Sequence, residues 1–285
     1  MAPSRIAYFT AGNAGVGHLV RGLTVRRALE RQGIRAEYRM FGPRLPFALA
    51  QRDDYQPVPI VEAELRSPAL ASAGLLAEAL RAFAPDVLLV DCYWAPLRHV
   101  LPLARCEAWL LARWLPPRWF LGPPDSPWEP RQYRRVIRIE PCDTPGVTDT
   151  LPPLVISNPD EARPKGALRA HLKVRDGERL SLVAHAGLPG EAASLAARAG
   201  EGYVVLSLHD ANALFPLAEW LGDADEVFTA AGYNSYWEAR WMGTEPRTRF
   251  CVLDRQRPEQ QWRLSTCAEE PMRENGADRL ARMLS

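Results

Sequence analysis

The architecture of this chain is best predicted from the sequence AGYNSYWEA at residues 231–239. The largely apolar run at residues 226–230 fits a short buried strand, Gly232 permits a tight turn, and the next residues open a helix. The first turn of a helix presents unpaired N–H groups and the positive end of the helix dipole, so a phosphate can bind there. The alternative is purely structural, because Ser235-x-x-Glu238 also fits a capping box.

A second segment, GNAGVGHLVR at residues 12–21, has the same order of strand, glycine loop and helix. An apolar run at residues 6–10 precedes it, and apolar residues at helical spacing continue to residue 32. Gly15 and Gly17 would let a ligand approach the backbone closely. The glycines are not spaced as GxGxxG, so a nicotinamide-dependent enzyme is not indicated.

The alternation of strand and helix signals continues through both halves of the chain. It predicts an α/β protein with two Rossmann-like, doubly wound domains at residues 1–152 and 165–285, joined by a proline-rich linker. Ligands of such sheets bind at the carboxyl ends of the strands, so we expect a cleft between the domains to hold the site. The other expected strands are 35–40, 87–91, 136–139, 180–184, 203–208 and 250–253, and the other expected helices are 70–83, 101–111, 191–199, 214–221 and 236–241.

Composition narrows the class of partner and the compartment. With a net charge of +1 over 285 residues, the chain has no overall field that would attract nucleic acid. It has neither a signal-peptide pattern nor a long apolar span, so we expect a cytoplasmic protein. The cysteines are scattered without a CxxC pair, which argues against a disulfide framework or a zinc site. They are Cys92, Cys106, Cys142, Cys251 and Cys267.

Three residues of the first half are candidates for catalysis or anion binding. His18 follows the glycine loop and could act as a general base, or it could simply bond to the loop backbone. Arg21, one turn later, could bind phosphate or lie in solvent. Asp91 ends the most apolar predicted strand, where it could orient His18 and stabilise its imidazolium form, or cap a helix.

The second half offers candidates for binding a nucleotide. Gly232 frees the turn, Asn234 and Ser235 can donate hydrogen bonds, and Glu238 could accept hydrogen bonds from ribose hydroxyls. The triplet at residues 259–261, Glu259, Gln260 and Gln261, is expected on a loop after a strand, where the amides could bind sugar hydroxyls.

Two further patterns have ordinary structural explanations. Asp223 and Asp225 form a DxD, which holds a metal in another class of sugar transferases, but their place before a strand favours turn and capping roles. Tryptophans gather at residues 94–128, interleaved with arginines. Core packing is the first explanation, and an apolar acceptor pocket or peripheral membrane contact is the alternative.

Taken together, the loop at residues 15–21, the AGYNS turn with Glu238, and the triplet at residues 259–261 resemble the GT-B glycosyltransferase superfamily. The chain looks most similar to MurG-like and predicted bacterial glycosyltransferases that carry GxGHxxR and AGYNS motifs. The resemblance covers both halves in the expected order. It implies an N-terminal acceptor domain and a C-terminal domain that binds a nucleotide-sugar, usually a UDP-sugar, without an essential metal.

The resemblance also implies roles for individual residues. Gly232, Asn234 and Ser235 would contact the diphosphate and Glu238 the ribose, while Gln260 or Gln261 would contact the transferred sugar. His18 would be the base or an anion-stabilising donor. Further donor-side positions are Gly15, Gly17, Arg21, His185, Gly187 and Glu259.

The sequence therefore predicts an inverting, metal-independent hexosyltransferase with a UDP-sugar as co-substrate and no other cofactor. Its acceptor would be a glycan, a lipid-linked molecule or a small molecule. One alternative is a nucleotide-sugar hydrolase, because the hydrolases of pseudaminic acid synthesis share the GxGHxxR loop and use its histidine to activate water. The other is a non-catalytic nucleotide-binding protein with the same fold.

Overall fold

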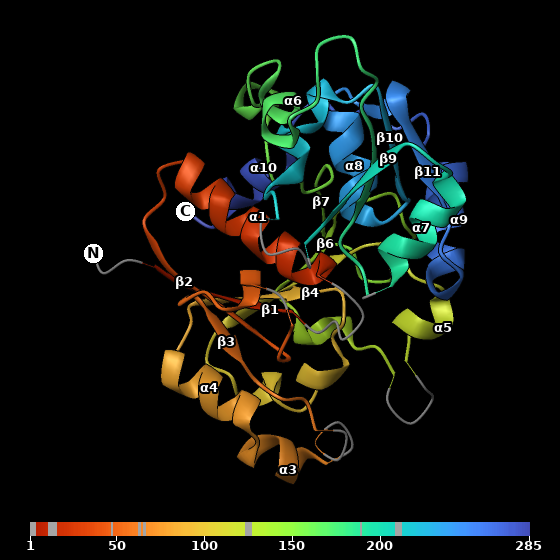
Figure 1. The fold of residues 1–285 in the computed structure, drawn as a ribbon. Coiled ribbons are helices and arrows are strands. Elements are labelled where there is room, and N and C mark those ends of the chain that lie inside the picture. Colours follow the sequence, from red (N-terminus) through yellow and green to blue (C-terminus); the bar gives the residue numbers. More distant parts are fainter. Residues whose placement is uncertain are drawn as a thin grey trace.

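The computed structural model of the protein describes residues 4–10, 16–46, 48–61, 64, 67–122, 127–188, 190–208 and 213–285. Within them the chain forms two parallel β-sheets flanked by helices. In Figure 1 strands β1 to β4 of the first sheet lie in the lower half, in red to yellow, and strands β9 to β11 of the second sheet lie in the upper half, in blue-green to blue. The fold class predicted from the sequence is confirmed, whereas the exact domain limits stay a prediction.

The first sheet holds seven described strands in the order β3-β2-β1-β4-β5-β6-β7. Strands β1 and β4 are apolar and almost wholly buried, as parallel strands covered on both faces should be. The chain order reverses between β1 and β4, and ligands bind beside such a switch point. The strands are β1 (Ser4–Phe9), β2 (Ala36–Gly42), β3 (Tyr55–Pro57), β4 (Val87–Asp91), β5 (Glu107–Ala112), β6 (Arg135–Arg138) and β7 (Asp149–Thr150), and the helices are α1 (Gly17–Arg31), α3 (Pro68–Ala73), α4 (Leu75–Phe83) and α5 (Pro117–Phe120).

The second sheet holds four described strands in the order β11-β10-β8-β9, again all parallel. Its switch point lies between β8 and β10, so the turns after these two strands face the same space. The strands are β8 (Ser181–His185), β9 (Tyr203–Ser207), β10 (Glu226–Ala230) and β11 (Thr248–Cys251), and the helices are α6 (Ala167–Leu172), α7 (Glu191–Ala199), α8 (Tyr233–Trp241), α9 (Arg257–Thr266) and α10 (Gly276–Met283).

The segment predicted as a linker, residues 152–164, is packed between the two halves for much of its length. Leu154, Val155 and Ser157 are almost completely buried. Helix α10, close to the C-terminus, packs beside α1 of the first half (Figure 1). The two halves therefore share a packed interface in addition to the covalent connection.

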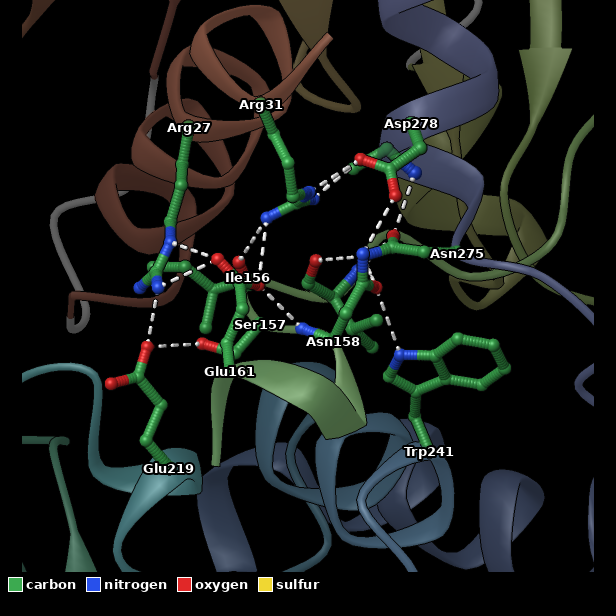
Figure 2. Close-up of polar contacts among 12 residues, drawn as sticks. Arg27, Arg31, Ile156, Ser157, Asn158, Glu161, Glu219, Trp241, Asn275 and Asp278 are labelled. Carbon is green, nitrogen blue, oxygen red and sulfur yellow. Dashed lines mark hydrogen bonds and ion pairs between the residues drawn. The ribbon is translucent and has the colours of Figure 1, made fainter. Parts of the chain in front are cut away.

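Figure 2 shows how charged groups hold this interface together. Arg27 and Arg31, near the end of α1, both pair with Glu161 of the linker, at 2.9 and 3.0 Å. Arg31 also pairs with Asp278 of α10 at 2.5 Å, and Asn158 donates to the same carboxylate. Helix α1 is thus fixed to the second half at its C-terminal end.

Three expected helices are wrong in part. The helix expected at residues 70–83 is two helices, because Gly74 is extended (φ −75°, ψ 160°) and separates α3 from α4. Residues 101–111 form a short 3-10 turn and then strand β5 instead of one helix, since Pro102 favours only a first turn. The segment at residues 214–221 contains only 3-10 turns, at Leu217–Glu219 and Leu221–Asp223.

Candidate functional site

A cleft of about 270 Å³ lies between the two halves and is lined by both of them. The first half contributes the start of α1, including His18, and Arg113 after β5. The second half contributes the carboxyl ends of its strands, the start of α8 and part of α9. The cleft is therefore at the place that the doubly wound topology predicts for a ligand.

His18, Asp91 and Arg21 form one buried cluster on the first wall of this cleft. The Nδ1 atom of His18 lies 3.0 Å from Oδ2 of Asp91, and Nε of Arg21 donates to both oxygens of the same carboxylate at 3.0 Å. Asp91 is 0% and Arg21 3% exposed, whereas His18 is 20% exposed. The two halves of the switch point bring these residues together, because His18 follows β1 and Asp91 ends β4.

The charges of the cluster set its protonation. Although burial opposes ionisation, the Arg21 guanidinium and His18 hold the pKa of the Asp91 carboxyl well below its usual range. Burial, helped by the positive charges of Arg21 and Arg113, lowers the pKa of His18 despite the opposing pull of Asp91. The imidazole is consequently neutral and the carboxylate ionised at neutral pH.

These charges also select one tautomer of the imidazole. An ionised carboxylate can only accept, so the Nδ1 of His18 carries the hydrogen that bonds to Asp91. The Nη2 atom of Arg21 also lies 3.0 Å from Nδ1, but the charge-assisted bond to the carboxylate is the stronger contact. His18 then keeps an unprotonated Nε2, which is what a general base requires.

The opposite wall begins with the turn before α8. Gly232 is the N-terminal cap residue of α8 in an extended conformation (φ −64°, ψ 158°), and no side chain caps the helix. The predicted capping box is wrong, because α8 begins at Tyr233 and Ser235 lies inside its first turn. A Cβ atom built on Gly232 would meet no atom within 4 Å, so the turn faces open space.

Two polar side chains of α8 line the cleft without a bond to another described residue. The Ser235 hydroxyl and the Glu238 carboxyl line the cleft, and neither bonds to another residue in the part of the chain that the structure describes. Burial raises the pKa of Glu238 to about 8. The free N–H groups of the first helical turn add hydrogen-bond donors to this part of the wall.

The two walls are held in register by direct bonds. The Asn234 side chain, at the start of α8, donates through Nδ2 to the backbone oxygen of Gly17, at the start of α1, at 3.1 Å. The hydroxyl of Tyr233 donates to Ile139 and accepts from the backbone N–H of Leu154. Arg21 lies over the Tyr233 ring, 5.1 Å from its centroid. The amide of Asn234 and the guanidinium of Arg21 are thus engaged by protein groups.

A second charged cluster lies at the end of β8. His185 Nε2 lies 2.9 Å from a carboxylate oxygen of Glu191, and Arg255 bonds to the same carboxylate. A Cβ atom on Gly187 would lie 2.0 Å from Glu191 and 2.2 Å from His185, so a larger residue there would displace this pair of side chains. His185, Gly187 and Arg255 all line the cleft.

The triplet at residues 259–261 lies in the first half of α9, so the loop expected there is wrong. Glu259 and Gln260 are buried and line the cleft, whereas Gln261 is exposed outside it. Gln260 accepts the N–H of Leu253 through its side-chain oxygen, and Glu259 pairs with Arg113. The helix forms because Pro258 can occupy a first turn and no later residue interrupts it.

The remaining sequence predictions divide between those the structure tests and those it does not. Asp223 accepts from the N–H groups of Gly166 and Leu168, and Asp225 from that of Leu180, so these aspartates cap backbone groups as expected. Trp94 and Trp128 pack in the core, as expected of the tryptophan-rich segment. The cysteines in the described residues are unpaired. Gly15 lies outside the described residues.

Some residues around the cleft had no signal in the sequence. Arg113 reaches Glu259 over a separation of 146 positions, and Glu140 pairs with Arg263 over 123, with both members almost fully buried in the second case. Arg255 was also missed, although its place shortly after an expected strand could have suggested it. Single arginines and glutamates in a charged, mixed sequence do not reveal such pairings.

No protein-family model matches this sequence, and no curated protein matches it significantly. Solved structures do share its fold. The glycosyltransferase SsfS6 of Streptomyces sp. SF2575 is 13% identical, with a TM-score of 0.50 over 99% of this chain and 94% of that one. The spinosyn rhamnosyltransferase SpnG, solved with spinosyn aglycone, is 17% identical, with a TM-score of 0.50 over 98% and 95%.

A Listeria monocytogenes protein named for UDP-N-acetylglucosamine 2-epimerase activity is similar to the same degree. It is 12% identical, with a TM-score of 0.50 over 99% of this chain and 91% of that one. At these identities the likeness shows the fold alone. The chain has the GT-B fold, as its sequence predicted.

Proposed function

We propose that this GT-B-fold chain is a glycosyltransferase that moves a sugar from a UDP-sugar to an acceptor hydroxyl with inversion and without a metal. The observation that carries the proposal is the His18–Asp91 pair, which lies on one wall of the cleft that also contains the open turn before α8. A base and an anion site in one cleft are the two parts that such a transfer needs.

The reaction follows from the two walls. Nε2 of His18 takes the proton of the acceptor hydroxyl. The oxygen of that hydroxyl forms a bond to the anomeric carbon of the sugar at the same time. The bond from that carbon to the diphosphate breaks on the opposite face, and the nucleoside diphosphate leaves with the electron pair. One displacement of this kind inverts the anomeric centre.

Each group has a physical reason to help this step. Asp91 holds the imidazole in the tautomer that can accept a proton and stabilises the imidazolium that forms. The start of α8 places N–H groups and the positive end of a helix dipole beside the negative charge that develops on the leaving diphosphate. Glu238 lies farther along the same helix, where it can bind the ribose hydroxyls.

The experiment is a donor and acceptor panel with purified full-length protein. UDP-sugars and TDP-sugars are incubated with glycan, lipid-linked and aromatic acceptors, with and without EDTA, and products are identified by NMR. We expect a glycoside with inverted anomeric configuration that also forms in EDTA. Retention of configuration would overturn the mechanism, and loss of turnover in EDTA would overturn its metal independence.

Hydrolysis is the second candidate, because a neutral His18 held by Asp91 could equally activate water. It would release free sugar and UDP at the same rate with or without an acceptor, which the same NMR spectra distinguish from transfer. A wild-type protein that binds none of the nucleotides or nucleotide-sugars at millimolar concentration would instead be a non-catalytic relative.

A further inference from the structure

The cleft contains an ion pair that joins its two halves and has no part in the reaction described above. Arg113 follows the last residue of β5, beside Cys92. Its Nη1 donates to the carboxylate of Glu259 on α9. Both side chains line the cleft, and they are only 11% and 10% exposed. Removing both charges from water costs free energy that can offset their attraction, so the pair is weak evidence for a role in stability. A role in the cleft is the other explanation.

The backbones on either side of this pair are firmly held. Trp114, the residue after Arg113, stacks on Trp262 of α9 with ring centroids 4.9 Å apart and planes 5° from parallel. The N–H of Trp114 donates to Glu140 at 3.0 Å, and Arg263 of α9 pairs with the same carboxylate. Arg113 and Glu259 are therefore presented to the cleft in a fixed geometry.

Of the triplet at residues 259–261, Glu259 is the member best placed to meet a ligand. Gln261 is exposed away from the cleft, and the side-chain oxygen of Gln260 accepts the N–H of Leu253. An ionised carboxyl group accepts hydrogen bonds from hydroxyl groups at both oxygens, whereas a protonated one loses part of that acceptor capacity. Although burial favours its neutral form, Arg113 lowers the pKa of Glu259 and keeps it ionised.

Arg113 also has a donor to spare. Its Nε is buried and finds no acceptor in the part of the chain that the structure describes. A buried donor without a partner costs free energy unless a ligand satisfies it. The pair therefore combines a fixed carboxylate with a nearby free N–H, which suits a sugar that presents hydroxyl groups on adjacent carbons.

Building on the proposed function, we infer that Arg113 is a positioning residue of the sugar end of the donor site. It holds the Glu259 carboxylate toward the hydroxyl groups of the transferred sugar, so the first half of the chain helps to select the donor. The substrate class is a sugar with free hydroxyl groups at that end, and a donor lacking those hydroxyls would lose the contact.

The test compares affinities for UDP and UDP-glucose, and for TDP and TDP-glucose, by calorimetry. The sugar increment is the dissociation constant of the nucleotide divided by that of the matching nucleotide-sugar. In Arg113→Met and in Glu259→Gln we expect it to fall about 10- to 100-fold, the range for a hydrogen bond to a charged group, with nucleotide affinity unchanged within about twofold. The double variant should lose no more than either single variant, because the two residues act as one unit.

A pH series separates positioning from a merely structural role. Without Arg113, the buried Glu259 takes up a proton, so the sugar increment of Arg113→Met should recover as pH rises from 6 to 9. The other charges near Glu259 are Arg263 on the same helix and His18 on α1. Both remain in the double variant, which should show no recovery and so removes their titration from the comparison.

Two further variants guard against misfolding. Arg113→Lys keeps the charge without the planar fork and should lose only part of the increment. Arg118→Met changes an exposed arginine of α5 and should lose nothing. A wild-type sugar increment that survives in both Arg113→Met and Glu259→Gln would overturn the inference. Failure of the wild type to bind either nucleotide would instead overturn the proposed function, and the inference with it.

Discussion

The starts of α1 and α8 are built alike and used differently. Each is the helix that follows a parallel strand at the switch point of its sheet, and the two helix starts meet through the bond from Asn234 to Gly17. At α1 the polar groups are paired with one another, whereas at α8 the Ser235 and Glu238 side chains find no partner among the described residues. The start of α1 is thus paired without a ligand, whereas the start of α8 keeps polar groups that a ligand could bind.

The largest effect should come from breaking the paired wall. Asp91→Asn leaves Arg21 buried without its counter-charge and no longer fixes the tautomer of His18. We expect the free energy of unfolding to fall by about 3–5 kcal/mol. Turnover of the donor that the wild type uses should fall about 10³- to 10⁴-fold. Urea titrations and initial rates measure the two losses.

The control for Asp91→Asn is Asp176→Asn, on an exposed turn, which should change stability by less than about 0.5 kcal/mol. The pKa of Asp91 is lowered in the folded state, so its contribution is present above the unfolded-state value of about 3.9 and is lost as pH falls below it. Equal stability of the two variants at pH 7 would contradict the account of the paired wall.

The second effect separates chemistry from binding. His18→Gln keeps the size and polarity of the side chain but removes the base, so turnover should fall about 10²- to 10⁴-fold while nucleotide affinity stays within about twofold. Because the pKa of His18 is lowered, the acid limb of the wild-type rate profile should lie below about pH 6.5. His99→Gln is the matched control. A variant with full activity would remove His18 from the reaction.

The third effect tests the open wall. Gly232→Val adds a branched side chain where no protein atom lies within 4 Å, in a backbone conformation that valine adopts readily. We expect an unchanged melting temperature and a loss of UDP affinity of at least about tenfold, because the side chain fills the space meant for the diphosphate. Gly222→Val is equally unhindered and does not itself line the cleft, so it should bind UDP normally. Normal binding by Gly232→Val would place the diphosphate elsewhere.

The last prediction concerns stability alone and rests on Glu238, whose pKa burial raises to about 8. A raised folded-state pKa means that stability is lost as pH rises from the unfolded-state value near 4.3 toward 8. Glu238→Gln should therefore melt higher than the wild type at pH 8.5, with a difference that disappears near pH 5. Glu201→Gln, at an exposed site, should show no such trend. A difference in melting temperature that does not change with pH would contradict a raised pKa of Glu238.

The comparison of the walls also shows what the sequence could predict. Local signals located β1, β8 and α7 within a residue or two, because an apolar run or an amphipathic period is contained in a few neighbouring residues. They also indicated His18 and Asp91 as a pair, since both follow strands that parallel topology brings together. Helix ends were predicted less reliably, because Gly74 divides the helix expected at residues 70–83 into two.

What the sequence did not reveal depends on distant partners. The start of α8 was misplaced because its cap is the backbone of Gly232 and no side chain marks it. Arg113 and Glu140 gave no signal because their partners, Glu259 and Arg263, lie more than a hundred positions away. The proline-rich segment was predicted only as a linker, but its apolar residues are buried in one core cluster with residues of α10.

Membrane contact was the weakest of the sequence hypotheses. Among the described residues, no helix is long and apolar enough to cross a bilayer. Trp119 and Leu121, beside the otherwise buried aromatic residues, are 43% and 41% exposed. Assays with glycan, lipid-linked and aromatic acceptors would identify the acceptor.

The central claim is that a nucleoside diphosphate binds at the start of α8, across the cleft from His18. A crystal structure of the protein with UDP tests it most directly. The account predicts density for the diphosphate at the N–H groups of residues 233–235, with the ribose near Glu238 and an open path from His18 to the terminal phosphate. A nucleotide bound away from the Gly232 turn, with the cleft empty, would contradict it.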